Sequence, residues 1–170
     1  AATVTAAAGQ LARISLVYLT NDIVQVEFSG AGTLTIALDA ASGPAAPVSY
    51  NQPDVPYMKG HARIVIAGAN ETTNVSVYSV GRANTVNQAI FRNDVTYDGV
   101  ADLAFVAIAT TNGKFGGVRT SNASFFAVNG LTGLYAPGVQ FTGPIFIEDI
   151  SASDSATAVL IIGSATDARI

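Results

Sequence analysis

Reactive and charged side chains are scarce in this chain of 170 residues. It contains no Cys, no Trp and a single His, and only 12% of its residues are charged. Without Cys there can be no disulfide, no thiolate nucleophile and no thiolate metal site. The one imidazole, His61, would have to serve any Ser–His–Asp arrangement, and no serine lies in a Gly-x-Ser-x-Gly elbow. The composition therefore favours a protein that is not an enzyme.

Long apolar runs and basic clusters are also missing. No window of 18 or more apolar residues occurs, so the sequence predicts no membrane insertion. The net charge is −4, and the eight Lys and Arg residues are scattered singly. Because binding to phosphates or to anionic lipid headgroups needs clustered positive charge, we expect neither nucleic acid nor a membrane surface as a partner.

Short segments of alternating polarity dominate what is present. Residues 24–28 and 34–38 each place apolar side chains at every second position, and Ser29–Gly32 separates them. Such alternation indicates half-buried β-strands. Further strands are expected at Ala62–Ile66, Asn74–Val80, Ala101–Ala109, Val118, Ser124–Val128, Val139–Phe141, Pro144–Ile150, Ala158–Ile162 and Asp167–Ile170.

Three regions fit this pattern less well. The four prolines within 42–56 predict a long loop, and Pro137–Gly138 predicts a turn. Residues 11–18 fit a short helix or a strand equally well, and 82–92 allow a short helix. Because strand patterns dominate the rest of the chain, the sequence predicts one all-β domain over 1–170. Residues 1–22 are a candidate N-terminal cap of this domain.

Two all-β architectures compete. Strand-like triplets recur about every 40 residues, which would cover two rungs of a right-handed parallel β-helix, a solenoid of about 20 residues per rung. These triplets are Val24-Gln25-Val26, Ile64-Val65-Ile66, Ala104-Phe105-Val106 and Ile145-Phe146-Ile147. The irregular spacers after Leu131 favour the solenoid. The clean alternation within 23–38 is equally typical of an antiparallel β-sandwich, which stays the alternative.

One segment has the spacing of a calcium loop. Asp94, Thr96, Asp98 and Asp102 place oxygen-bearing side chains at alternate positions, and Gly99 follows Asp98 directly. Ca²⁺ takes six to eight oxygen ligands, and Gly permits the sharp bend such a loop needs. The ten residues 94–103 resemble the calcium loops of FG-GAP-type repeats, although Thr96 replaces a carboxylate or amide. The resemblance implies Asp94, Asp98 and Asp102 as ligands of a calcium ion; the alternative is a turn whose Asp side chains cap backbone amides.

Exposed tyrosines suggest a second kind of site. Tyr97 and Tyr135 lie in or near expected loops and strand faces, where an aromatic ring could stack against a sugar. The alternative is an ordinary role in the core or in a cross-strand pair. The carboxylates Glu148 and Asp149, with Asp154, are candidates for glycoside cleavage, and their spacing equally fits a solvated strand end.

The function most consistent with these features is a non-catalytic, secreted or cell-surface β-domain with a structural or adhesive role. Other protein chains or glycans would be its partners. The alternatives are a carbohydrate-binding module with a structural calcium ion and, less favoured, a polysaccharide lyase or hydrolase. The strand-like ending at Asp167–Ile170 suggests a piece of a longer protein.

Overall fold

A computed structural model of the chain describes residues 2–17, 22–39, 61–82, 100–127, 130–152 and 155–170. Every regular element in these ranges is a β-strand and none is a helix, which confirms the all-β prediction. Residues 11–17 form a strand, so the helical alternative for this segment is wrong. The loop expected at 42–56 lies outside the described residues, as does nearly all of the helix considered for 82–92.

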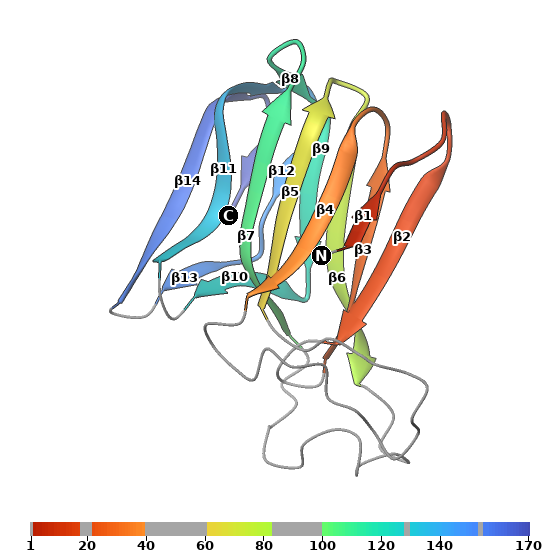
Figure 1. Cartoon of the computed structure of the whole chain (residues 1–170). Coiled ribbons are helices and arrows are strands. Elements are labelled where there is room, and N and C mark those ends of the chain that lie inside the picture. Colours follow the sequence, from red (N-terminus) through yellow and green to blue (C-terminus); the bar gives the residue numbers. More distant parts are fainter. Residues whose placement is uncertain (1, 18–21, 40–60, 83–99, 128–129, 153–154) are drawn as a thin grey trace.

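The strands form two mixed sheets that lie face to face (Figure 1). Sheet A comprises β1 (Ala2–Val4), β4 (Thr33–Asp39), β5 (His61–Ala69), β7 (Ala101–Thr110), β8 (Lys114–Phe115), β10 (Ala123–Ala127), β11 (Gly130–Phe141), β13 (Ile150–Ala152) and β14 (Ala156–Ala165). Sheet B comprises β2 (Leu11–Val17), β3 (Asp22–Ser29), β6 (Asn74–Arg82), β9 (Gly117–Ser121), β12 (Ile145–Phe146) and β15 (Ala168–Arg169).

Strand pairing changes character along the chain. The pairs among β1, β4 and β5 and among β2, β3 and β6 are antiparallel. From β5–β7 and β6–β9 onward every described pair is parallel. Parallel neighbours require the chain to cross over between them, so each later segment returns in the same direction beside the one before it.

One apolar core fills the space between the sheets. Because side chains alternate across a strand, every second residue points inward, and paired strands align these residues in rows. One such row crosses sheet A through Ile36, Ile64, Val106, Leu134 and Leu160. Its first four members are buried, whereas Leu160, on the edge strand β14, is 40% exposed.

Like residues stack along the core. Phe115 of β8 pairs with Phe141 of β11, both rings are fully buried, and their centroids lie 5.5 Å apart with a tilt of 57°. Burying a side chain of this size contributes about 1.5–3 kcal/mol, and the tilted geometry suits the quadrupoles of the two rings.

The four triplets of the sequence repeat are not equivalent in space. Ile64-Val65-Ile66 and Ala104-Phe105-Val106 lie side by side in sheet A, where Ile64 pairs with Val106. The first and last triplets belong to sheet B, within β3 and at β12. The spacing of about 40 residues therefore does not mark one structural position repeated along the chain.

The turn expected at Pro137–Gly138 is instead an irregularity inside β11. The strand pairs with β14 on both sides of it, Ala136 with Ile162 and Gln140 with Ser164. The extra residues form a bulge, and Gly138 takes a φ of +70° there. A bulge and a turn need the same residue types, so the sequence alone does not separate them.

Backbone groups of successive turns stack at one end of the sheets. The N–H of Gly116 donates to the carbonyl of Thr73 (2.9 Å), and the N–H of Gly143 donates to the carbonyl of Gly116 (2.7 Å). A Cβ at Gly116 would lie 2.4 Å from that Thr73 oxygen, and one at Gly143 would lie 2.9 Å from the Gly116 oxygen. Only glycine lets these turns approach so closely.

Candidate functional site

The predicted calcium ligands fall mostly outside the described residues. Asp94 and Asp98 lie there, as does Tyr97, and of Asp102 only the backbone is described, paired in β7 with Ser124 of β10. Within the described ranges no group of three or more His, Asp or Glu side chains could hold a metal ion. The calcium loop stays a prediction.

Tyr135, the other predicted binding residue, lies on the outer face of sheet A, the face that points away from sheet B. It belongs to β11, pairs with Ala107 of β7 and Ile161 of β14, and is 39% exposed. Tyr135 is thus accessible on a strand face, and its role in binding stays a prediction.

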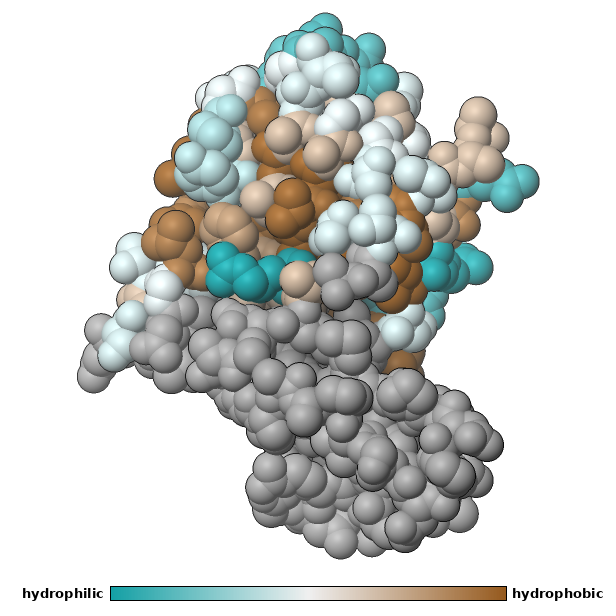
Figure 2. Space-filling model, in the orientation of Figure 1, coloured by the Kyte–Doolittle hydropathy of each residue, from teal (hydrophilic) through white to brown (hydrophobic). Residues whose placement is uncertain are grey.

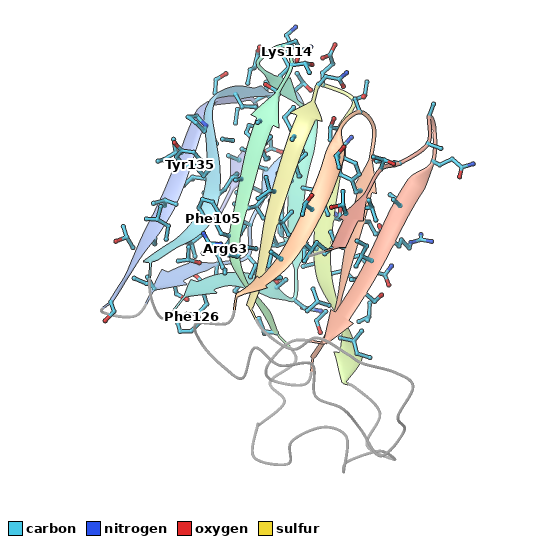
Figure 3. The ribbon with its side chains drawn as sticks, in the orientation of Figure 1. Arg63, Phe105, Lys114, Phe126 and Tyr135 are labelled. Atoms are coloured by element: carbon cyan, nitrogen blue, oxygen red, sulfur yellow. The ribbon has the colours of Figure 1, made fainter. Side chains whose placement is uncertain are left out.

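Two further side chains extend from Tyr135 across the sheet. The ring of Phe105 in β7 stacks against that of Tyr135, with centroids 6.1 Å apart and planes inclined by 27°. The guanidinium of Arg63 in β5 lies 5.2 Å from the centroid of Phe105. Arg63, Phe105 and Tyr135 thus form a line over three neighbouring strands, which we call the aromatic row (Figure 3).

Small neighbours make room for these rings. Phe105 pairs with Gly133 and Tyr135 pairs with Ala107, so each ring lies beside a small residue and meets the other ring diagonally. A Cβ at Gly133 would lie 2.0 Å from the carbonyl oxygen of Val159, and its φ of +119° also favours glycine. No larger side chain fits beside Phe105, which keeps this part of the face flat.

Apolar side chains surround the aromatic row. Val65 of β5, Leu131 of β11 and Ile161 of β14 are 48%, 43% and 40% exposed. Figure 2 shows hydrophobic surface gathered in the middle of the described part of this face, with hydrophilic surface at the end formed by the turns, at the right edge and next to the grey atoms. Exposed apolar residues that cluster in this way mark interaction surfaces more often than singly scattered ones do.

The outer face of sheet B carries a polar network instead. Arg13 Nε donates to Glu27 Oε1 at 2.9 Å, and the Tyr78 hydroxyl donates to the same oxygen at 2.7 Å. The hydrogen bonds from Arg13 and then Tyr78 lower the pKa of Glu27, and the bond to Glu27 raises the pKa of Tyr78. These pKa shifts favour an ionised Glu27 and a protonated Tyr78, the states in which the two hydrogen bonds form. Because the bonds connect β2, β3 and β6, we assign this network a structural role.

A second Arg–Phe pair lies on the outer face of sheet B. The Arg119 guanidinium lies 5.6 Å from the centroid of Phe146, and the two residues pair across β9 and β12. Phe146 is 36% exposed and lines a shallow pocket of about 470 Å³ with Ser121 and Arg169. This pair repeats the Arg63–Phe105 contact without a stacked tyrosine.

Glu148, one of the carboxylates considered for glycoside cleavage, has a hydrogen-bond partner 26 residues away in the chain. The Glu148 carboxylate accepts a hydrogen bond from the N–H of Asn122, whose φ of 49° places it in the left-handed region. The backbone carbonyl of Asp149 accepts a bond from the N–H of Phe125, and Asp154 lies outside the described residues. Glu148 thus stabilises a tight turn. The single histidine, His61, is the first residue of β5, and its side chain is not described.

Arg63 and Phe105 were not predicted as site residues. The β5–β7 register shifts between Ala62 and Arg63, which brings Arg63 opposite Phe105. A register shift of this kind depends on the neighbouring strand, so only the polar–apolar alternation of residues 63–66 could have hinted at an outward Arg63.

Comparison with protein-family models, with curated proteins and with solved structures finds no significant match. The part of the chain that the structure describes contains no helix long and apolar enough to cross a membrane.

Proposed function

We propose that this chain is a non-catalytic β-domain with a structural and adhesive role, and that the outer face of sheet A is its contact surface. The observation that carries the proposal is the difference between the two outer faces. Sheet A gathers Val65, Leu131, Tyr135 and Ile161 around the aromatic row. The exposed apolar residues of sheet B lie on strands that are not neighbours, and the network centred on Glu27 joins three of its strands; these apolar residues are Leu11, Val80 and Phe146. Tyr, Phe and Arg are the residues enriched where proteins bind partners.

The proposed architecture is a parallel β-helix in the C-terminal half. In support, Val118 of β9 pairs with Ile145 of β12, which pairs with Ala168 of β15, so successive returns of the chain are offset by about 25 residues. The antiparallel β1 and β2, within residues 1–22, would serve as the N-terminal cap. The antiparallel pairs are also what a β-sandwich would use, and that architecture is the alternative.

The proposed setting is the cell surface or the extracellular space, where a low-charge domain would act as a spacer or contact module within a longer protein. The scarcity of charged residues, at 12%, and the absence of Cys are compatible with it. The continuous core and the stacked turns support a rigid module, because interiors packed in this way transmit strain.

Surface display tests the adhesive role. The chain would be displayed on a non-adherent laboratory bacterium, and retention of the cells on a panel of protein-coated and glycan-coated surfaces would be measured under flow. The double variant Leu131→Lys/Ile161→Lys places two charges on the outer face of sheet A. The matched control, Ser76→Lys, places one on β6 of sheet B.

We expect wild type and the control to be retained on at least one surface, and the double variant to wash off like cells that display nothing. Equal retention of wild type and double variant at matched display levels would refute the assignment of this face. Release of reducing ends or unsaturated products from a polysaccharide panel would instead favour the lyase or hydrolase alternative.

A structural calcium ion belongs to the same proposal and has its own test. If Asp94, Asp98 and Asp102 are ligands, excess Ca²⁺ should raise the thermal midpoint relative to EDTA, since an ion that binds only the folded state stabilises it. Asp98→Asn should abolish that shift. Identical midpoints of the wild-type protein in Ca²⁺ and in EDTA would exclude the site.

A further inference from the structure

We infer that the aromatic row binds a short stretch of a neutral, β-linked pyranose chain. The inference rests on the proposed adhesive function and names the ligand of that same face. Tyr135 supplies the stacking surface, Phe105 supports it, and the Arg63 guanidinium supplies hydrogen-bond donors at the other end of the row (Figure 3).

The chemistry of the row matches a sugar ring with equatorial substituents. Such a ring presents its axial C–H bonds on one flat side, and those weakly positive hydrogens suit the negative face of an aromatic ring. Its hydroxyl groups lie at the edge, where the five N–H donors of a guanidinium can bond to several oxygens at once. Tyr135 is 39% exposed and available for stacking, whereas Phe105 is nearly covered.

The row is held in place before any ligand arrives. Phe105 lies between Tyr135 and Arg63. Its ring centroid is 6.1 Å from that of Tyr135 and 5.2 Å from the guanidinium carbon of Arg63. A cation held over a ring face is stabilised by the ring quadrupole. Side chains that are already ordered lose less conformational entropy when a ligand binds.

The size of the face favours a small ligand over a second protein chain. The exposed region spans β5, β7, β11 and β14 over residues 131–135 of β11. Strands about 4.8 Å apart with a rise of about 3.3 Å per residue make this roughly 300 Å². A stable protein interface buries about 800 Å² on each partner, so the face suits an oligosaccharide segment better than a second copy of the chain.

The charge of the chain favours a neutral ligand. At a net charge of −4, the protein as a whole repels polyanions such as nucleic acids and uronate polymers. Within the described part of the outer face of sheet A, Arg63 is the cationic residue of the row; it pairs with Ala37 of β4 and lies over the ring of Phe105. A neutral chain meets the Arg63 donors and the Tyr135 ring without an unfavourable long-range field.

Titration with soluble oligosaccharides tests the inference. Cellohexaose and xylohexaose would be titrated into the full chain and followed by calorimetry and by amide chemical shifts, with polygalacturonate oligomers as the anionic arm. The variants are Tyr135→Ala, Tyr135→Phe and Arg63→Lys. The matched control is Phe146→Ala, which removes the other exposed Arg–Phe contact, on sheet B.

We expect saturable binding of at least one neutral hexaose, with shifts centred on β7 and β11. Tyr135→Ala should weaken binding about tenfold, the loss expected for removing one stacking ring. Tyr135→Phe, which keeps the ring, should stay within about threefold. Arg63→Lys should weaken binding severalfold because it removes the planar donor fork, and Phe146→Ala should bind as wild type does. Circular dichroism melts of each variant separate lost binding from lost folding.

Any of three results would overturn the inference: no saturable binding of either neutral hexaose, preferential binding of the anionic oligomers, or an equal loss in Phe146→Ala. Concentration-dependent dimerisation that Tyr135→Ala abolishes would assign the face to a second copy instead. If displayed cells are retained through this face while the wild-type protein binds no hexaose, the glycan inference fails and the adhesive proposal stands.

Discussion

The stacked turns make Gly116 a position where one added methyl group should be costly. Gly116 lies between β8 and β9, its N–H donates to the Thr73 carbonyl, and its own carbonyl accepts from Gly143. Its φ lies outside the positive region, so Gly116→Ala should introduce no backbone strain of its own. The effect of the substitution should come from contact alone.

The magnitude follows from the distances. The added Cβ would lie 2.4 Å from the Thr73 carbonyl oxygen and 2.7 Å from Asn74 Oδ1, whereas real Cβ contacts are essentially never under 3.0 Å. The turns must separate by about half an ångström, which weakens the hydrogen bond to Thr73. Overpacking of this kind costs about 1–3 kcal/mol, and weakening a buried hydrogen bond adds about 1 kcal/mol. The smaller entropy of the unfolded Ala chain returns about 0.4–1 kcal/mol.

Gly116→Ala should therefore lower the free energy of unfolding by about 1–3 kcal/mol, which for a chain of this length is a fall in Tm of about 3–10 °C. Thermal and urea denaturation, followed by circular dichroism, measure both quantities. The control is Gly113→Asn: a Cβ there meets nothing within 4 Å, and Asn tolerates its φ of +74°. A Gly116→Ala protein as stable as the wild type would refute the stacking of these turns.

Three further predictions concern the core and the face of sheet B. Leu134→Ala should lower the free energy of unfolding by about 2–5 kcal/mol, because Leu134 is fully buried. Leu160→Ala, at the 40% exposed end of the same row, should lower it by less than about 1 kcal/mol in the same urea titration. Equal losses would mean that β14 is covered in solution. Thr132→Val should raise the unfolding free energy by about 1 kcal/mol because the buried Thr132 hydroxyl has no hydrogen-bond partner among the described residues. Thr120→Val should lower it by a similar amount because the Thr120 hydroxyl accepts a backbone N–H at 3.0 Å, and the reverse order would contradict both assignments. Glu27→Gln should destabilise the protein at pH 7, and the difference should shrink as the pH falls. The folded state lowers the pKa of Glu27 below its usual 4.5, so its contribution is complete well above pH 4.5 and is lost as the pH falls through the lowered pKa. A difference independent of pH in parallel urea titrations would contradict the role given to its Arg and Tyr partners.

Strand positions were predictable where one face of a strand alternates cleanly. Residues 24–28 and 34–38 lie in β3 and β4 as expected, because burial on one side alone imposes a two-residue period. Residues 130–138 were harder, since Gly130, Gly133, Pro137 and Gly138 indicate turns. They lie within β11, which is paired along much of its length to β14, and tertiary pairing overrides a local preference for turns.

Of the three residues of the aromatic row, only one could be predicted from the sequence. Tyr135 was predictable as an accessible aromatic because it lies near an expected turn and an expected strand face. Its neighbours Phe105 and Arg63 are 30 and 72 residues away in the chain, and no local pattern joins them. Their contacts follow from which strands become neighbours and from the register shift in β5–β7.

Composition and periodicity alone determined that this protein is a β-rich chain with an aliphatic interior and few groups suited to catalysis. These are local properties, since a side chain's polarity and its place in a two-residue period do not depend on distant partners. Strand neighbours, parallel direction and register were decided only in three dimensions, because many pairings bury the same apolar residues almost equally well. Close backbone approach at Gly116 and the meeting of Arg63, Phe105 and Tyr135 exist only in one of those pairings.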